Sequence, residues 1–409
     1  MSKPLFVAGT ARGGTNLAIM IASVHPEVAL VQDPYLALLK SFRNAVGKGA
    51  VGDFDLQSPL DEYYYSDEKL RVMQQVQNAT LDVPFDPAER DPLLATLAAR
   101  MKLSAPALIP RLGQLRGRTY RELMEAGLRL IGLARNKPDA EWIGFNDNWA
   151  IEFFGPLART FPDARFVAIV RDGRSAVASH VRIMEAKHRN PLYTYKKDPS
   201  MIAMTLSFVR CWRKHVAFAH HYQKTLGDRL FVLRYERLVQ QPAAETERLC
   251  SFLAIDYRPE MIDASQFIAG DGKVWIPNSN HENAPEGGIY ASTVDRWKQT
   301  MPSDMADLVE FVAGPDLAFA GYARSRDWDD GMPWGAYRRH ADEHRKWIGG
   351  GFGWRTDNRD PDLDFSFELL RRQCLKRQVD DPALIERCFL FPEVYESIMS
   401  GDALVPKCA

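Results

Sequence analysis

The sequence predicts an α/β fold in which helices flank a parallel β-sheet, giving three layers. Two observations lead to this class. Short apolar runs typical of buried strands alternate with stretches of helical periodicity along most of the chain. A glycine-rich turn also joins the first apolar run directly to the first helical stretch, as is common where a strand leads into its covering helix.

The first elements follow from this alternation. A strand is expected at residues 4–9 (PLFVAG), and residues 15–24 (TNLAIMIASV) place their apolar side chains on one face of a helix. A second strand is expected at 28–32 (VALVQ) and ends at Asp33-Pro34. Residues 40–140 are less regular and mostly helical in pattern, so we interpret them as a helical insertion.

The alternation of strands and helices returns after this insertion. Further strands are expected at 141–145, 165–170 and 229–236. Further helices are expected between Asn148 and Phe161, within 171–186, at 200–225 and at 241–255.

The C-terminal part of the chain has a different composition. Beyond about residue 330 it is rich in Gly and Trp, and helical patterns follow near 364–378 and 382–400. We therefore predict an α/β domain at residues 1–328, which includes the helical insertion, and a mainly helical extension at 329–409 packed on it.

Composition excludes several classes of function. The 409 residues include 52 Lys and Arg against 53 Asp and Glu, so no bulk attraction to nucleic acid is expected. The five cysteines show no metal-like spacing, which favours reduced thiols, no metal site and a cytoplasmic location. No run of 18 apolar residues occurs, so we expect no membrane span.

The turn GTARGGTNL has the features of an anion site. A strand that leads through glycines into a helix directs free N–H groups and the positive end of the helix towards one point. Gly13 and Gly14 allow close approach, Thr15 can donate its hydroxyl and cap the helix, and the cation is Arg12. The spacing from Gly9 to Gly14 is that of a P-loop, yet Thr15 stands where an ATP site has lysine. Taken alone, the segment also fits a tight turn without a ligand.

A second candidate anion site follows the strand at 165–170. Arg171 comes directly after that strand, at the edge where open α/β sheets bind ligands. Ser179 lies about two helical turns further on, so the pair could hold a second phosphate. Taken alone, Arg171 also fits a residue that pairs with a carboxylate or with a helix end.

Four segments in order resemble the sulfotransferases that use 3′-phosphoadenosine-5′-phosphosulfate (PAPS). GTARGGTNL is similar to that family's 5′-phosphosulfate loop, and AIVRDGRSAVAS is similar to its 3′-phosphate motif. VLRYERLVQQPAAETERLCSFLAID resembles the strand and helix that follow, and TVDRWKQTM with FAGYA resembles the closing segment. The resemblance covers residues 4–323 and implies a P-loop NTPase-like fold, with PAPS as co-substrate and no required metal.

The resemblance also implies a role for each matching residue. The residues that would hold the 5′-phosphosulfate are Arg12, Gly13, Gly14, Thr15 and Asn16. Arg171 and Ser179 would hold the 3′-phosphate. Tyr235 would approach the adenine, and Arg296 or Lys298 would close over the 3′ end. The implied reaction is transfer to a hydroxyl of a carbohydrate, glycolipid, tyrosine or small metabolite, with release of 3′-phosphoadenosine-5′-phosphate (PAP).

The reaction needs a general base for the acceptor hydroxyl. Asp33 stands where some branches of the family place a glutamate, and Asp147 in GFNDNW is the alternative. Asp33 before proline also fits a simple turn. Arg12 is the third residue expected in catalysis, because charge develops on the leaving phosphate beside it. The family usually has a lysine where this chain has Asn146, so the second cation of the phosphosulfate site is not identified.

Two other classes of function stay open at this stage. A P-loop nucleotide kinase or NTPase requires a lysine beside Gly14 and a magnesium-binding acid, and an adaptor would keep the fold without the chemistry. His215, His220 and His221 are expected to form a solvated helix face rather than a metal site. The sequence identifies neither the acceptor nor the oligomeric state.

Overall fold

The structure is a computed structural model of the chain, in which the described residues form two compact units. The described residues are 2–52, 67–148, 150–188, 201–270, 272–275, 288–325, 350–351, 354–355 and 361–404. The first unit comprises Met1–Phe54, Arg71–Ile169 and Tyr222–Ala291, and the second comprises Asp55–Leu70, Val170–His221 and Ser292–Ala409. The boundary expected at residue 328 lies outside the described residues and stays a prediction.

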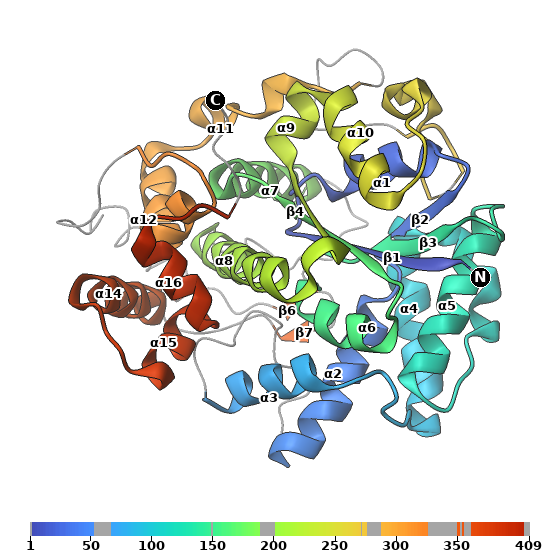
Figure 1. Cartoon of the computed structure of the whole chain (residues 1–409), viewed down its shortest axis with the longest axis horizontal. Coiled ribbons are helices and arrows are strands. Elements are labelled where there is room, and N and C mark those ends of the chain that lie inside the picture. Colours follow the sequence, from blue (N-terminus) through green and yellow to red (C-terminus); the bar gives the residue numbers. More distant parts are fainter. Residues whose placement is uncertain are drawn as a thin grey trace. The chain divides into compact units, whose positions relative to one another are not determined.

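A five-stranded sheet with the order β2-β3-β1-β4-β5 organises the first unit (Figure 1). Its strands are β1 (Lys3–Gly9), β2 (Val28–Gln32), β3 (Trp142–Asn146), β4 (Arg165–Val170) and β5 (Leu230–Arg234). β1 pairs in parallel with β3 and β4, and β2 pairs in parallel with β3. The predicted parallel sheet flanked by helices is confirmed.

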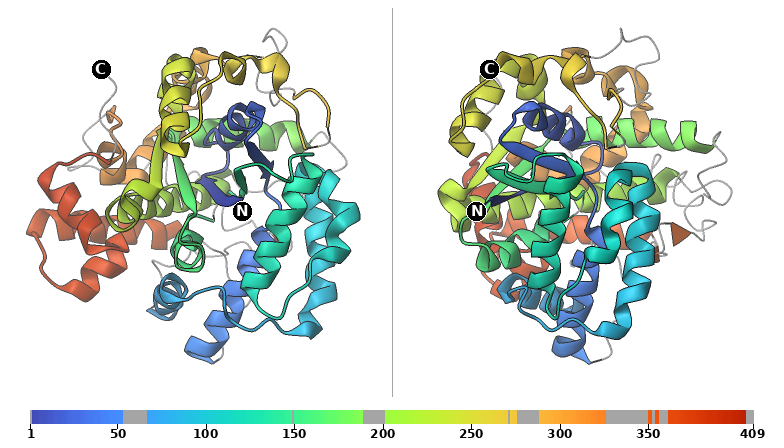
Figure 2. Two further views of the ribbon diagram at one scale, coloured as in Figure 1. Left: turned by 45° about the vertical axis from the view of Figure 1, so that its right-hand side comes forward. Right: turned by 90° about the vertical axis from the view of Figure 1, so that its right-hand side faces the viewer.

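Helices cover both faces of this sheet (Figures 1 and 2). On one face, α1 (Thr15–Val24) contacts β1, β2 and β3, and α10 (Pro242–Leu253) contacts β5. On the other face, α5 (Tyr120–Ala134) contacts β2 and β3. Burial from both sides explains why the strands carry continuous apolar runs instead of alternating polar residues.

Aromatic rings fill one layer of this core. Phe6 of β1 lies 5.4 Å from Phe145 of β3 and 5.7 Å from Phe166 of β4, measured between ring centroids. Phe154 of α6 (Phe154–Thr160) packs on Phe166 at 4.9 Å. Such contacts fix the register of the three central strands and therefore the positions of the loops at their ends.

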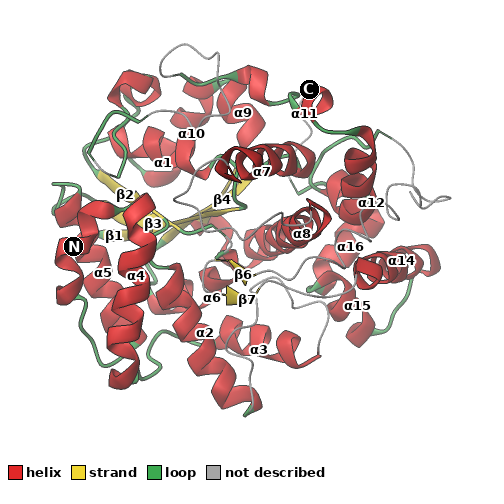
Figure 3. Cartoon of the chain, turned by 180° about the vertical axis from the view of Figure 1, so that it is seen from behind, coloured by secondary structure: helices red, strands yellow, loops and turns green. Residues whose placement is uncertain are grey.

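The predicted insertion is helical, as Figure 3 shows. It contains α2 (Leu36–Val51), α3 (Asp67–Asn78), α4 (Arg90–Ser104) and α5. Thr119 begins α5 by accepting the N–H of Glu122 at 3.2 Å, the usual N-cap bond. Short 3₁₀ segments η2 to η8 occur at Pro87–Glu89, Pro106–Gln114, Ile151–Phe153, Gly227–Arg229, Pro259–Ile262, Ala264–Gln266 and Ala291–Thr293.

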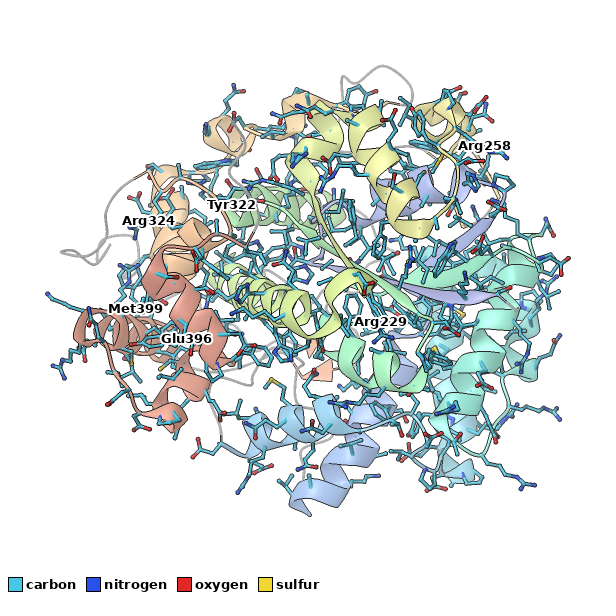
Figure 4. The ribbon with its side chains drawn as sticks, in the orientation of Figure 1. Arg229, Arg258, Tyr322, Arg324, Glu396 and Met399 are labelled. Atoms are coloured by element: carbon cyan, nitrogen blue, oxygen red, sulfur yellow. The ribbon has the colours of Figure 1, made fainter. Side chains whose placement is uncertain are left out.

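β5 ends earlier than the sequence predicts, and a distant residue holds the turn after α6. The sequence predicts a strand through residue 236, but β5 ends at Arg234 and α9 (Tyr235–Gln240) begins at once. The apolar pattern carries no Gly or Pro at this point to mark the change. Arg229, labelled in Figure 4, donates to the carbonyl of Pro162 at 2.6 Å and so holds the turn after α6.

The described part of the second unit is mostly helical. Its helices are α7 (Gly173–His188), α8 (Met201–Leu226, of which the last turn belongs to the first unit), α11 (Trp297–Thr300), α12 (Ser303–Phe319), α14 (Pro361–Arg377), α15 (Pro382–Phe389) and α16 (Pro392–Ser400). An antiparallel pair joins β6 (Gly350–Gly351) and β7 (Trp354–Arg355). The helices expected near 364–378 and 382–400 are confirmed, the second as two helices.

Buried ion pairs attach the C-terminal helices to α12. Arg371 of α14 pairs with Asp316 of α12 at 2.7 Å and with Glu368 at 2.9 Å, and all three are almost fully buried. Removing one partner of such a pair would leave an uncompensated buried charge, which is costly. The C-terminal helices therefore belong to the folded core of the second unit.

The expected solvated face of α8 is wrong. His220 is buried and lies 3.0 Å from the Ser397 hydroxyl, and His221 lies 2.6 Å from Glu393 and stacks on Phe391. His215 is also buried. His220 and His221 therefore join α8 to α16 instead of facing water.

None of the described helices is long and apolar enough to cross a membrane. Within the same described ranges, no group of three or more His, Cys, Asp or Glu side chains could hold a metal ion.

Candidate functional site

The loop between β1 and α1, here called the anion loop (residues 10–16), has an unusual backbone. Arg12 and Gly14 both have positive φ, at 65° and 96°. Gly14 is the N-cap of α1, and a Cβ at this position would overlap the ring of Tyr235. The sequence expectation that Thr15 caps the helix is therefore wrong, because Thr15 is the first helical residue. Only glycine combines this conformation with this contact.

The end of α1 that follows the anion loop suits an anion. Its first turn contains no acidic residue. The first N–H groups of a helix have no intrahelical acceptor and carry the positive end of the helix dipole. Among the described residues, the Oδ1 of Asn16 is buried without a hydrogen-bond partner. A loop of this kind can receive a phosphate or a sulfate.

A chain of hydrogen bonds links the anion loop to the ends of two neighbouring strands. The Thr15 hydroxyl donates to Asn148 Oδ1 at 3.0 Å. Asn148 Nδ2 donates to Asp33 Oδ2 at 3.1 Å, and the Asn148 backbone N–H donates to Asp33 Oδ1 at 2.9 Å. Asp33 follows β2 and Asn148 follows β3, so the parallel order of the strands brings them together.

Asp33 has an environment that changes its acidity. Burial raises the pKa of Asp33, and the hydrogen bonds from Asn148 and Gln32 oppose the rise. The charge of Arg100, on α4 of the insertion, also opposes it. A carboxylate with a raised pKa is a stronger base than an exposed one, which suits proton abstraction near neutral pH.

Asp147, the alternative base, is 1% exposed. Its Oδ2 accepts the N–H of Tyr35 at 3.0 Å, at the start of α2. Burial, and then the neighbouring charge of Asp33, raise the pKa of Asp147 well above its ordinary value. This side chain therefore supports the start of a helix and exposes almost none of its surface.

Three further residues at or near this edge of the sheet, Asn146, Asn148 and Arg100, complete the comparison with the sequence predictions. Asn146, the counterpart of the family's lysine, is fully buried, and no described residue hydrogen-bonds to its side chain. Neither Asn148 nor Arg100 was predicted as a site residue. Asn148 follows β3 by two positions, so its spacing offered a weak signal, whereas Arg100 lies in a helix far along the chain from Asp33.

The second expected anion site lies in the second unit. Arg171 is 8% exposed, and its Nη2 donates to the carbonyl of Thr293 at 3.2 Å. The backbone carbonyl of Arg171 accepts from Trp212 Nε1 at 2.8 Å. Ser175, in the first turn of α7, donates to the carbonyl of Val294 at 2.7 Å. The structure thus brings together the start of α7 and the predicted closing segment.

Arg174 strengthens this junction. Its guanidinium pairs with Asp172 at 2.7 Å and Glu310 at 2.5 Å, and lies 4.3 Å from the centre of the Trp297 ring. An arginine paired on two sides and stacked on an aromatic ring holds its neighbours in fixed positions. Trp297 directly follows Arg296 in the closing segment. Its contact with Arg174, which the sequence did not predict as a site residue, therefore holds the closing segment beside Arg171.

The remaining residues of this site differ in exposure. Ser179 lies on α7 and is half-buried, as is Arg296. The side chain of Lys298 is 58% exposed and pairs with Asp295 at 2.8 Å. A surface pair of this kind contributes little to stability, so Lys298 can change its partner at low cost.

Comparisons with known proteins agree on one family. The protein-family model described as "Sulfotransferase family" matches residues 4–259. Carbohydrate sulfotransferase 3 of Homo sapiens is 24% identical over 194 residues, covering 43% of this chain and 37% of that protein. Protein-tyrosine sulfotransferase 1 of Danio rerio is 25% identical over 206 residues, covering 49% of this chain and 53% of that protein. The matches thus span about half or less of these relatives.

Among solved structures, the sulfotransferase domain from the Synechococcus PCC 7002 olefin synthase is similar. It is 16% identical, with a TM-score of 0.41, over 76% of this chain and 95% of that chain.

Proposed function

The chain belongs to the sulfotransferase family, and we propose that it transfers a sulfuryl group from PAPS to an acceptor hydroxyl and releases PAP. One observation carries the proposal: Thr15 of the anion loop is joined through Asn148 to the carboxylate of Asp33. Sulfuryl transfer needs a donor-binding loop beside a proton-accepting carboxylate, because the donor must be held where the acceptor loses its proton.

The anion loop fits the phosphosulfate end of PAPS. PAPS would supply the sulfuryl group together with a phosphate as leaving group. Gly13 and Gly14 lack the Cβ that would keep the backbone from an anion, and Thr15 and Asn16 open the helix whose N–H groups face it. The amide of Asn16 can turn its Nδ2 to the buried position now held by Oδ1 and donate to an anion there.

Arg12 acts on the charge that develops during transfer. Sulfuryl transfer resembles phosphoryl transfer, in which negative charge builds on the leaving oxygen. A guanidinium in the same loop stabilises that charge more in the transition state than in the ground state. The loop contains no lysine, so Arg12 is the cation available for the charge-stabilising role that lysine has in an ATP site.

Asp33 is our candidate for the general base. Its raised pKa improves its ability to take a proton, and Asn148 fixes both of its carboxylate oxygens. Asp147 is too deeply buried to contact an acceptor. We therefore assign Asp147 the structural role at the start of α2.

The family resemblance assigns residues of the second unit to a 3′-phosphate. Arg171 and Ser179 would bind the 3′-phosphate, and Arg296 or Lys298 would close over it from the closing segment. In the first unit, Tyr235 would contact the adenine, because its ring already lies against Gly14 of the anion loop.

The acceptor contacts the insertion in this proposal. Asp33 is followed by α2, and its carbonyl accepts from Ser104 at the end of α4 at 3.4 Å. These helices therefore border the carboxylate that would deprotonate the acceptor. We propose a hydroxyl acceptor from the class of carbohydrates, glycolipids, tyrosines or small metabolites.

A binding and transfer experiment tests the proposal. PAP at about 100 times its Kd should raise the free energy of unfolding by about 2.7 kcal/mol, while ATP with magnesium should not. The protein should then move radiolabelled sulfate from PAPS to at least one member of a mixed panel of hydroxyl acceptors. Stabilisation by ATP with magnesium but not by PAP would favour the nucleotide kinase or NTPase instead, and PAP binding without transfer would favour an adaptor.

A further inference from the structure

The side chain of Asn148 is the only described group that hydrogen-bonds both the Thr15 hydroxyl and the carboxylate of Asp33. We infer that Asn148 is a positioning residue that couples the Thr15 hydroxyl to Asp33, so that an anion in the loop changes how the base is held. The inference rests on the proposed function, because it takes Asp33 as the base. Neither the family match nor the relatives assign a role to this residue.

The hydrogen-bonding capacities of the three groups fix their roles. An ionised carboxylate only accepts, so the Nδ2 of Asn148 must face Asp33, at 3.1 Å. The Oδ1 of the same amide then faces Thr15 and can only accept, at 3.0 Å. Thr15 is therefore the donor, and its single hydroxyl hydrogen is used by Asn148.

This arrangement makes two acceptors compete for one hydrogen. If Thr15 donates to a phosphate or sulfate oxygen, as the family resemblance implies, its hydroxyl must leave Asn148. The backbone N–H of Thr15 needs no such exchange, since it lies in the first turn of α1. Binding of an anion therefore removes one hydrogen bond from Asn148.

The change reaches Asp33 through the amide. A hydrogen bond accepted at Oδ1 polarises the amide and strengthens the bond donated from Nδ2. When Thr15 turns to the anion, the donation to Asp33 weakens and the carboxylate holds a proton more tightly. The base thus becomes stronger when the donor is in place.

Other groups near Asp33 provide the necessary comparison. Gln32 donates to Asp33 Oδ2 at 3.2 Å but does not contact Thr15 through any described bond. Arg100 from α4 acts on Asp33 by its charge, and the charge of Asp33 in turn raises the pKa of Asp147 after β3. A change that passes through Asn148 should depend on Thr15, whereas a change through Gln32 should not.

The test measures the pKa of Asp33 in the ligand-free protein by carbon-13 NMR of labelled aspartate, with the signal assigned from Asp33→Asn. Thr15→Val should raise the pKa of Asp33, because Asn148 loses its donor. The same substitution in an Asn148→Ala background should leave the pKa of Asp33 unchanged. In the matched Gln32→Ala background, Thr15→Val should raise it as in the wild type.

Several outcomes decide the inference. No shift with Thr15→Val, or an equal shift in the Asn148→Ala background, would overturn it. Asn148→Ser provides a second variant in case Asn148→Ala does not fold. We also expect Asn148→Ala to lower kcat by about tenfold or more, with a smaller change in KM for PAPS. This is the usual effect of losing a hydrogen bond to a charged group. Because the NMR titration needs no turnover, it separates failure of the coupling from failure of the proposed function.

Discussion

The ring of Tyr235 lies against the backbone of Gly14, in the space that a Cβ at position 14 would need. Gly14 has φ of 96°, which side chains other than glycine rarely adopt. The end of β5 and the start of α1 are thus packed together at the anion loop. This contact predicts how adding a methyl group at position 14 affects stability and PAP binding.

Gly14→Ala should destabilise the protein and weaken PAP binding. The backbone strain alone costs about 1–3 kcal/mol, and the methyl group must also displace the ring of Tyr235. Gly49→Ala is a matched control, because a Cβ at this exposed position of α2 meets nothing within 4 Å. That control should be neutral or stabilising by up to about 1 kcal/mol. Urea denaturation and calorimetric titration with PAP would show the difference, and equal stability of the two variants would contradict the prediction.

Arg12→Ala should lose activity with little loss of fold. Removal of one donor at the leaving group costs about 3 kcal/mol, or a hundredfold or more in kcat. Arg12→Lys keeps the charge but not the planar fork of donors, so it should recover only part of the rate. Steady-state kinetics with PAPS and the melting temperature measure the two effects. Unchanged turnover in Arg12→Ala would remove Arg12 from the mechanism.

The rate should fall as pH falls through the pKa of Asp33. Because burial raises this pKa above its ordinary value of 3.8, the acid limb of kcat should lie at a higher pH than the titration of an exposed aspartate. Asp33→Asn should lower kcat by about 10²–10⁴, the usual contribution of a general base. The exposed Asp82→Asn serves as a control for the loss of one carboxylate. An unchanged acid limb in Asp33→Asn would assign the proton transfer to another group.

Stability should depend on pH through Asp147. A carboxyl whose pKa is raised in the folded state binds its proton more tightly there than in the unfolded chain. The free energy of unfolding should therefore fall as pH rises from about 4 towards the folded pKa of Asp147. Asp147→Asn should flatten this dependence, since it cannot ionise.

Urea midpoints between pH 4 and pH 8 would measure the slope. Asp163→Asn, at an exposed turn position after α6, should keep the slope of the wild type. A steeper fall in Asp147→Asn than in the wild type would show that the sign is wrong.

The sequence predicted the strands well because each is an apolar run buried on both faces of the sheet. It also placed α1 correctly, since its apolar residues repeat at helical spacing. The end of β5 was misjudged, because the chain passes from strand to helix at Tyr235 without a breaking residue. Local pattern cannot show that change, nor that Tyr235 packs against Gly14 from far along the chain.

The candidate site was only partly predictable. The anion loop is local in sequence, so glycines and a following helix were sufficient to find it. Asn148 and Arg100 act on Asp33 from segments far along the chain, and only the order of the strands and the packing of α4 bring them close. Asp33 and Asp147 looked similar in sequence because both follow a strand, and only burial separates them.

Arg171→Ala should remove the preference for a 3′-phosphate. If Arg171 binds that group, wild-type protein should bind PAP more tightly than 5′-AMP, which lacks it. Loss of a charge-assisted hydrogen bond costs about 1.5–3 kcal/mol, so the Kd for PAP should rise about 10- to 150-fold while the Kd for 5′-AMP changes little.

Arg171 also donates to the carbonyl of Thr293, so its loss could loosen the closing segment. Thr293→Pro is not a clean control, because it changes the backbone. Ser175→Ala is the better control, because it removes the hydrogen bond from Ser175 to the carbonyl of Val294 and leaves Arg171 unchanged. Ser175→Ala should therefore keep the preference for PAP. If both variants lose it equally, the selectivity comes from the closing segment and not from the guanidinium of Arg171.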